Sequence, residues 1–305
     1  MQTKNKQSHT PIVAAFGVVC LDYIVIAPYI DPGGYSPIKD YKTEGGGLQG
    51  NALVAASRLG AKTYILGWVG SDDIGDEIIS GLEKENINTQ GLVRVQDGKS
   101  VFSWVLVDSE TAERTIYCRK DYLPNKSIDD IDFSLIDKAD VLMFDDHFSN
   151  EARKVAEYAK NKGIFTVCDI RLREENYDIL ALSDYAIISD KNVLSLSADN
   201  DYFSALSKML ELGCSNAVIT AGENGCYYSD GNKKGHIKAF EIDAIDTTGA
   251  GDAFHGAFAF CIAKKMNLNE SLVYSSAVSA INCLSLGGRS GLPNPEEVAS
   301  FLKIH

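Results

Sequence analysis

Short apolar runs alternate with longer amphipathic runs along most of the chain. Continuous apolar runs predict buried strands, because a strand in a parallel sheet is covered on both faces. We expect strands at residues 12–20, 63–69, 141–144, 165–168, 185–188, 217–220 and 239–245. We expect helices at residues 52–59, 76–85, 150–161, 205–212, 253–263 and 268–284. This alternation predicts an α/β fold: a doubly wound, mostly parallel sheet with helices on both faces.

Two segments interrupt this rhythm: residues 23–43, which carry several prolines and glycines, and residues 100–119. The second alternates apolar and polar residues around Asp108-Ser109, which predicts a β-hairpin. We join both segments into a small β-sheet lid, toward which residues 86–95 should return. Such a lid excludes water and orders an acceptor, and it also offers an edge for a homodimer. The core would then comprise residues 11–22, 44–99 and 120–305.

Composition and charge narrow the classes of partner. The chain has 305 residues, is 45% hydrophobic, and carries a net charge of −13, which argues against non-specific binding to nucleic acid or an anionic membrane. Residues 1–10 lack the apolar region of a secretory signal, and the longest apolar run is too short to span a bilayer. The seven cysteines are scattered without a CxxC pair, so we expect reduced thiols and a cytoplasmic location.

The stretch DTTGAGDAFHG, from Asp246 to Gly256, carries the strongest chemical signal. It lies between the strand expected at 239–245 and the helix expected at 253–263. Backbone N–H groups at Gly249-Ala250-Gly251, at a helix N-terminus, would hold an anion, and Asp252 beside them could accept a hydroxyl proton. This combination suits phosphoryl transfer to an alcohol. The structural alternative is that Asp252 only caps the helix and the glycines only turn the chain.

A second glycine-rich string, Gly45 to Gly50, matches the dinucleotide pattern GxGxxG, with the acid pair Asp72-Asp73 roughly 20 residues further on. That pattern must follow a buried strand, whereas residues 39–44 are largely polar. An NAD-dependent dehydrogenase is therefore the least favoured reading. The sequence contains no GxxxxGK[ST], which argues against a P-loop enzyme.

Both strings resemble the signatures of the ribokinase-like (PfkB) carbohydrate kinases. The pattern D-T-x-G-A-G-D is intact at 246–252, and GG-x-x-x-N followed by LG occupies 46–60. Locally, residues 17–22 resemble ketohexokinases, and GGRSGLP at 287–293 is similar to sulfofructose kinases. The resemblance spans nearly the whole chain. It implies a ribokinase-like fold and an ATP-dependent kinase acting on a monosaccharide, most simply a ketose.

The resemblance also implies roles at the sugar end. Asp252 would be the general base beside the Gly249-Ala250-Gly251 anion hole. Asp22 and Asn51 would bind sugar hydroxyls, and Gly46-Gly47 would form the hinge beneath the lid.

At the nucleotide end, the resemblance assigns the strand and turn around Thr220, Gly222 and Gly225 to ATP. Lys191 could reach a phosphate, although it could equally be a solvated lysine. Asn282 and the loop 287–293 would border the adenine and a monovalent-cation site, for which K⁺ is the expected ion. Asp246 would share that cation through its loop, and Mg²⁺ would accompany ATP.

Polar residues end several other expected strands. For Asp145 and Asp146 we favour capping, and for His147 a structural role over one in specificity. Asp169 and Arg171 could lie near the substrate. The family's Asn-x-x-Glu is replaced by Ser189-Asp190-Lys191-Asn192, so no residue is assigned to Mg²⁺, and no cluster of basic residues marks a sulfonate or phosphate on the sugar. A nucleoside kinase and a catalytically silent sugar-binding regulator remain the alternatives.

Overall fold

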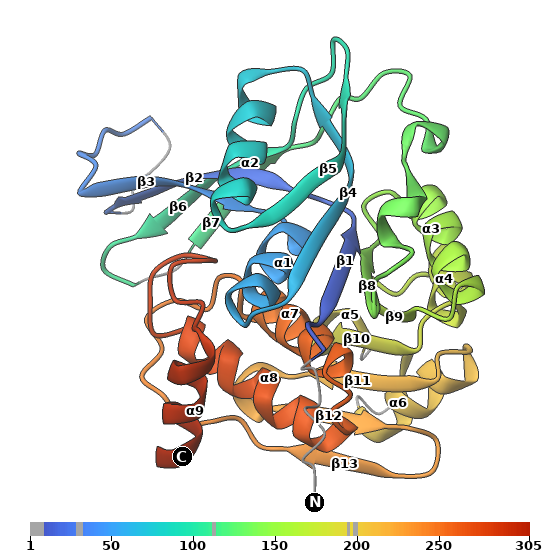
Figure 1. Ribbon diagram of the computed structural model, residues 1–305. Coiled ribbons are helices and arrows are strands. Elements are labelled where there is room, and N and C mark those ends of the chain that lie inside the picture. Colours follow the sequence, from blue (N-terminus) through green and yellow to red (C-terminus); the bar gives the residue numbers. More distant parts are fainter. Residues whose placement is uncertain (1–8, 29–32, 112–113, 194–195, 198–200) are drawn as a thin grey trace, which may run out of the picture.

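A computed structural model describes residues 9–28, 33–111, 114–193, 196–197 and 201–305. Within these residues the chain forms a large sheet, a small sheet and helices that pack on both faces of the large sheet (Figure 1). The α/β, doubly wound class predicted from the hydrophobic pattern is confirmed.

The large sheet has nine strands, and seven of them run parallel. In spatial order they are β13 (Lys234–Ile237), β12 (Cys226–Ser229), β11 (Asn216–Thr220), β10 (Tyr185–Ser189), β9 (Phe165–Asp169), β8 (Val141–Asp145), β1 (Ile12–Phe16), β4 (Lys62–Gly70) and β5 (Ile87–Val95). The chain moves from β1 to β4 and β5, then returns to β8 on the other side of β1. In such sheets, ligands bind outside the carboxyl ends of the strands where this direction reverses.

Alternate strand residues face two separate apolar layers. In β1, Val13 and Ala15 face one layer, and Ala14 and Phe16 face the other. The first layer is covered by α1 (Leu48–Arg58), α2 (Asp73–Lys84), α7 (Ala250–Ala263), α8 (Leu268–Asn282) and α9 (Pro295–Ile304). The second is covered by α3 (Ser149–Asn161), α4 (Tyr177–Ala181), the short α5 (Asp190–Val193) and α6 (Tyr202–Glu211).

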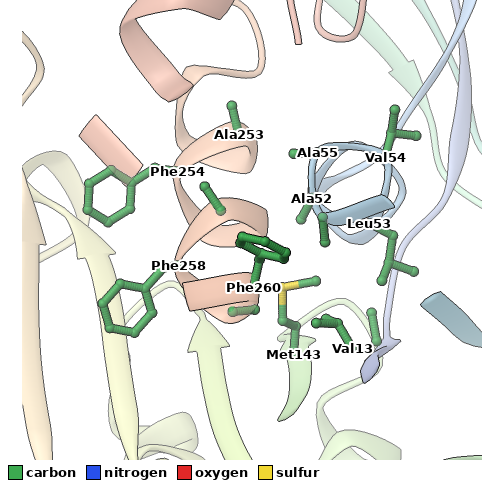
Figure 2. Packing of buried hydrophobic residues seen from close by; sticks show 14 of the residues in the cluster. Val13, Ala52, Leu53, Val54, Ala55, Met143, Ala253, Phe254, Phe258 and Phe260 are labelled. Atoms are coloured by element: carbon green, nitrogen blue, oxygen red, sulfur yellow. The ribbon is translucent and has the colours of Figure 1, made fainter. Parts of the chain in front are cut away.

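Helix α7 is buried on almost every side, as expected for a helix that is apolar all round. It lies beside α1, and Figure 2 shows the aromatic side chains of α7 and the small side chains of α1 in one apolar layer. At their closest approach, a Cβ on Gly256 would lie 2.0 Å from the backbone oxygen of Ala52. Only glycine allows this contact. The contact brings the first turns of the two helices together.

The small sheet has the order β3 (Asp40–Gly46), β2 (Cys20–Ala27), β6 (Phe102–Asp108) and β7 (Arg114–Arg119). It projects from the side of the main body (Figure 1). Strands β6 and β7 form the predicted hairpin. Strands β6 and β7 lie within the segment 100–119 expected to form part of a lid. Strands β2 and β3 overlap the segment 23–43 and extend beyond it, to residues 20–22 and 44–46. Residues 29–32 and 112–113 of those segments lie outside the described residues.

The strand predicted at residues 12–20 is wrong, because β1 ends at Phe16. Gly17 has φ +153°, and a Cβ there would lie 2.2 Å from a carboxylate oxygen of Asp145. That carboxylate accepts the Val18 N–H at 2.9 Å. The contact with β8 ends the strand and directs the chain out of the large sheet into β2.

One further strand prediction needs correction. Residues 239–245 form no strand, because no neighbouring strand pairs with them. Instead the Phe240 ring packs on Phe301 of α9, and the Ile245 N–H donates to the Cys283 oxygen at 2.8 Å. Residues 86–95, expected to return toward the lid, form the edge strand β5, parallel to β4, and the chain continues from it into β6 of the small sheet.

All seven cysteines are free thiols. Among the residues that the structure describes, no helix is both long and apolar enough to cross a membrane.

Candidate active site

The first turns of α1 and α7 meet through a hydrogen bond between two of the predicted site residues. Asn51 Nδ2 donates to Asp252 Oδ2 at 2.7 Å. Asn51 is buried, whereas Asp252 is partly exposed. The packing of α7 on α1 at Gly256 fixes this pair. The Asp252 carboxylate is therefore held by the Asn51 amide and remains partly accessible to solvent.

Burial raises the pKa of Asp252 to about 7. The hydrogen bond from Asn51 and the positive charges of His255 and Arg289 act in the opposite direction, while the neighbouring Asp169 raises the pKa further. A carboxylate with a pKa near neutrality is well matched to accept a proton at physiological pH. The electrostatics therefore agree with the predicted role of a general base.

The backbone in front of Asp252 forms the predicted helix N-terminus. Gly249 adopts a left-handed conformation with φ +70°, and a Cβ there would lie 2.8 Å from the Gly288 backbone. The Ala250 N–H already donates to the Thr247 oxygen at 3.3 Å. Apart from its chain neighbours and the backbone of its own helix, no atom of the described residues lies within 4 Å of the position that a Cβ on Gly251 would take. The space over Gly251, at the positive end of the α7 dipole, could therefore admit an anion.

The other predicted sugar-binding residues lie on the small sheet and at the start of α1. Asp22 is on β2 and Gly46 is opposite Cys20 at the end of β3. A Cβ on Gly46 would lie 2.1 Å from Asp22 Oδ2, and one on Gly47, at φ +86°, would lie 2.6 Å from the Val18 oxygen. Both glycines are therefore required where β3 passes β2 and enters α1. Burial raises the pKa of Asp22, as it does for Asp252.

Arg289 is a central residue that the sequence analysis missed. It is 6% exposed, and it donates through Nε to Asn51 Oδ1 at 2.7 Å and through a terminal nitrogen to the Gly46 oxygen at 3.1 Å. Its donation fixes the orientation of the Asn51 amide, so that the amide nitrogen faces Asp252. Gly45 and Gly50 leave room for it, since a Cβ on either would lie within 2.8 Å of the guanidinium.

We expect Arg289→Met to lower the free energy of unfolding by about 2–4 kcal/mol, because it leaves the Asn51 and Gly46 oxygens buried without a donor. Chemical denaturation measures this change. The matched control is Arg153→Met, which removes a surface pair with Asp178 and should cost less than about 1 kcal/mol. Equal losses for the two variants would contradict the role of Arg289 in holding Asn51.

The residues predicted to bind the nucleotide lie along the carboxyl ends of β10 and β11. Thr220 ends β11 opposite Ser189, which ends β10, and Lys191 lies in α5 directly after it. Gly222 has φ +54° with open space around it. Glycine is required at position 225 by the fold itself, since a Cβ there would lie 2.0 Å from the Ile237 oxygen. This edge lies beside α7, since His255 Nε2 is 2.9 Å from the Ile187 oxygen of β10.

At the predicted cation site around Asp246, the oxygen atoms already accept hydrogen bonds from groups of the protein. Asp246 accepts hydrogen bonds from Thr248 and from the Gly287 N–H at 2.8 Å, and Arg114 of β7 contacts both Asp246 and Thr248. Lys42 of β3 donates to the Leu286 oxygen at 2.6 Å. These donors occupy the groups that a monovalent cation would need. The arrangement does not fit a K⁺ ion at Asp246.

Asn282 lies at the end of α8 and donates to the Thr248 oxygen at 3.2 Å, while its own buried amide oxygen has no hydrogen-bond partner among the described residues. It therefore holds the loop that carries Asp246.

The remaining strand-end residues mostly serve the fold. Asp145 accepts from the N–H groups of Val18 and His147, and Asp146 pairs with Arg171 at 3.1 Å. The His147 ring contacts Asp121 at 3.1 Å. Asp169 places a carboxylate oxygen 3.8 Å from Nε2 of His255 on α7.

Comparison with known proteins assigns the family. A profile of the pfkB family carbohydrate kinases matches residues 13–295. The chain belongs to this family. It is 26% identical to probable fructokinase-2 of Arabidopsis thaliana, over 99% of both chains.

Two solved structures have the same fold. The ribokinase of Thermotoga maritima is 27% identical with a TM-score of 0.82, covering 96% of this chain and 99% of that one. The ribokinase of Arabidopsis thaliana complexed with ribose and ATP is 20% identical with a TM-score of 0.85, covering 97% and 99%. As a pfkB family carbohydrate kinase, the protein is a phosphotransferase with an alcohol group as acceptor.

Among the described residues, no group of three or more His, Cys, Asp and Glu side chains is placed to hold a metal ion.

Proposed function

We propose that this carbohydrate kinase transfers the γ-phosphoryl group of ATP to a hydroxyl of a monosaccharide, with a ketose as the favoured acceptor. The observation that carries the proposal is the Asn51–Asp252 pair at the N-terminus of α7. It joins a base, an anion site and the predicted hydroxyl-binding residues of the small sheet in one place.

Each group then has one task. Asp22 and the Asn51 amide hold sugar hydroxyls, and Asp252 accepts the proton of the hydroxyl that attacks. The N–H groups at Gly249 and Gly251 face the oxygens of the transferring phosphoryl group. Bound Mg²⁺ would neutralise charge on the ATP phosphates. Thr220, Gly222 and Lys191 would line the nucleotide end, beside the first turn of α7.

The inner face of the small sheet favours a sugar over a nucleoside. Asp22, Ile24, Ser103 and Val105 share the face that looks toward Asp252, because alternate residues of a strand share a face. A nucleoside acceptor would favour aromatic side chains there. The described aromatic residues of this sheet, among them Tyr23 and Trp104, lie on the opposite face.

Release of ADP from Mg-ATP tests the proposal. A panel of ketoses, aldoses, sulfosugars and nucleosides is offered to the full chain, and we expect release that depends on a monosaccharide. Release of ADP only with nucleosides would show that the acceptor is a nucleoside and not a monosaccharide. Binding of sugar and ATP without turnover on any acceptor would establish the silent regulator.

The activity should depend on pH through Asp252. Burial raises the pKa of Asp252 to about 7, and only the ionised form accepts a proton. We therefore expect kcat/KM to rise with pH through about 7 with the slope of a single proton, and then to level off. ADP release measured between about pH 5 and 9 checks this. A profile flat across neutral pH would contradict the assignment of Asp252 as base.

A dehydrogenase is not supported by the glycine string 45–50. The strand before it, β3, is largely exposed, belongs to the small sheet and pairs antiparallel with β2. A dinucleotide site needs a buried parallel strand at that position.

We also propose that two copies associate through the outer face of the small sheet. Tyr41, Trp104 and Tyr117 lie there with exposed fractions of 74%, 46% and 61%, next to the half-exposed Leu106. Packing this face on a second copy would remove these side chains from water. Light scattering should give twice the 33.1 kDa mass of one chain, and Trp104→Glu should give the single-chain mass. A single-chain mass for the wild type would exclude this interface.

A further inference from the structure

His255 is a buried histidine that none of the roles above uses. It lies on α7, three residues after Asp252, and is 6% exposed. Its Nδ1 is 2.8 Å from the Gly251 oxygen and its Nε2 is 2.9 Å from the Ile187 oxygen of β10. The ring therefore bridges the first turn of the catalytic helix and a central strand.

The partners of this ring determine its protonation. Both are backbone carbonyl oxygens, which only accept hydrogen bonds. A neutral imidazole has one N–H, so its other nitrogen would point a lone pair at a carbonyl oxygen inside the protein. Such a buried mismatch costs about 1–3 kcal/mol. Only the imidazolium, with a hydrogen on each nitrogen, satisfies both contacts.

The charges around the ring agree with this assignment. Asp169, at the end of β9, places a carboxylate oxygen 3.8 Å from Nε2, and Asp252 faces the ring from its own helix. Burial opposes the charge on His255, but Asp169 and the two carbonyl groups outweigh it, so the pKa lies above its usual value. Arg171 is adjacent to Asp169, and Arg289 is the other buried cation next to Asp252.

We propose that His255 is a protonated positioning residue, which ties the anion-site turn of α7 to β10 and favours the ionised form of Asp252. Its imidazolium balances Asp169, whose negative charge would otherwise favour the protonated form of Asp252. The catalytic consequence rests on the proposed function, whereas the protonation of His255 does not.

The protonation is tested on the wild-type chain by NMR. Histidine labelled with ¹⁵N reports each ring nitrogen separately, and the signal missing from His255→Gln identifies the residue. We expect both nitrogens of His255 to remain protonated at pH 7.5, above the ordinary histidine pKa of about 6.5. A single neutral tautomer of His255 at pH 7.5 would overturn the proposal.

Two substitutions test the link to Asp252 by the sign of their effects. His255→Gln removes the positive charge and keeps one donor, so the acid limb of the kcat/KM profile should move up by about one pH unit. Asp169→Asn removes the opposing charge and should move the limb down. His9→Gln is the control. His9 contacts Asp140, which precedes β8 at the amino end of the strand, so this substitution should leave the acid limb in place.

A purely structural role for His255 would reduce activity at every pH and leave the acid limb unchanged, which would overturn the link to Asp252. Failure of the proposed function looks different, because the wild type would then release no ADP with any acceptor. The NMR result would still decide the protonation of His255.

Discussion

Replacing Asp252 by asparagine should abolish most turnover while leaving a folded protein that is more stable than wild type above neutral pH. An amide cannot accept the hydroxyl proton, so we expect kcat to fall by a factor of about 10² to 10⁴. The amide oxygen of the variant can still accept the hydrogen bond that Asn51 donates at 2.7 Å in the wild type. The site should therefore keep its shape, and ATP binding measured by calorimetry should persist.

The gain in stability follows from the pKa of Asp252. Burial raises that pKa to about 7, above the ordinary aspartate value of about 3.9 in an unfolded chain. The folded protein therefore binds this proton more tightly than the unfolded chain, and stability is lost as pH rises between these two values. Asparagine carries no charge and avoids this loss. The variant should match wild type below about pH 4 and exceed it by on the order of 4 kcal/mol above pH 7.

Denaturation of both proteins across this pH range, with ADP release in parallel, separates the two effects. Asp178→Asn is the matched control, because Asp178 lies on the surface in a pair with Arg153 and should leave turnover unchanged. Wild-type turnover by Asp252→Asn would remove the general base from the mechanism. A less stable variant at high pH would mean that the carboxylate serves the fold.

The hydrophobic pattern predicted most strands of the large sheet because their burial is a local property of the sequence. It failed at residues 12–20 because the break at Gly17 depends on Asp145, which lies in another strand. It failed at 239–245 because an apolar extended segment becomes a strand only if a neighbour is free to pair with it. Both failures concern contacts between segments that are distant in sequence.

The same distinction applies to the site. The two glycine-containing signatures pointed to Asn51 and Asp252, and the structure places these side chains in contact. Arg289 and His255 were missed because the role of a buried cation depends on which oxygens surround it. The one local signal was a charged residue among glycines at 287–291, where a solvent-exposed turn is the ordinary explanation.

Replacing Gly251 by alanine should abolish transfer without destabilising the protein. Apart from its chain neighbours and its own helix backbone, no atom of the described residues lies within 4 Å of the position of the new Cβ, so the methyl group fits the folded chain. Alanine is also favoured over glycine in a helix by up to about 1 kcal/mol. However, a Cβ in a helix points toward the N-terminus, so here it projects from the first turn of α7 into the anion site. We expect at least about a 10²-fold loss of kcat/KM, comparable to losing an anion-site donor.

Two other glycines make this result specific. Gly81→Ala, inside α2 and equally free of contacts, should gain similar stability and keep full activity. Gly249→Ala should lose both, because its left-handed backbone and the Gly288 backbone at 2.8 Å leave no room for a side chain. Thermal unfolding and ADP release are measured for all three variants. Full activity of a stable Gly251→Ala protein would show that the phosphoryl group does not approach the first turn of α7, and the anion site would then have to be sought elsewhere.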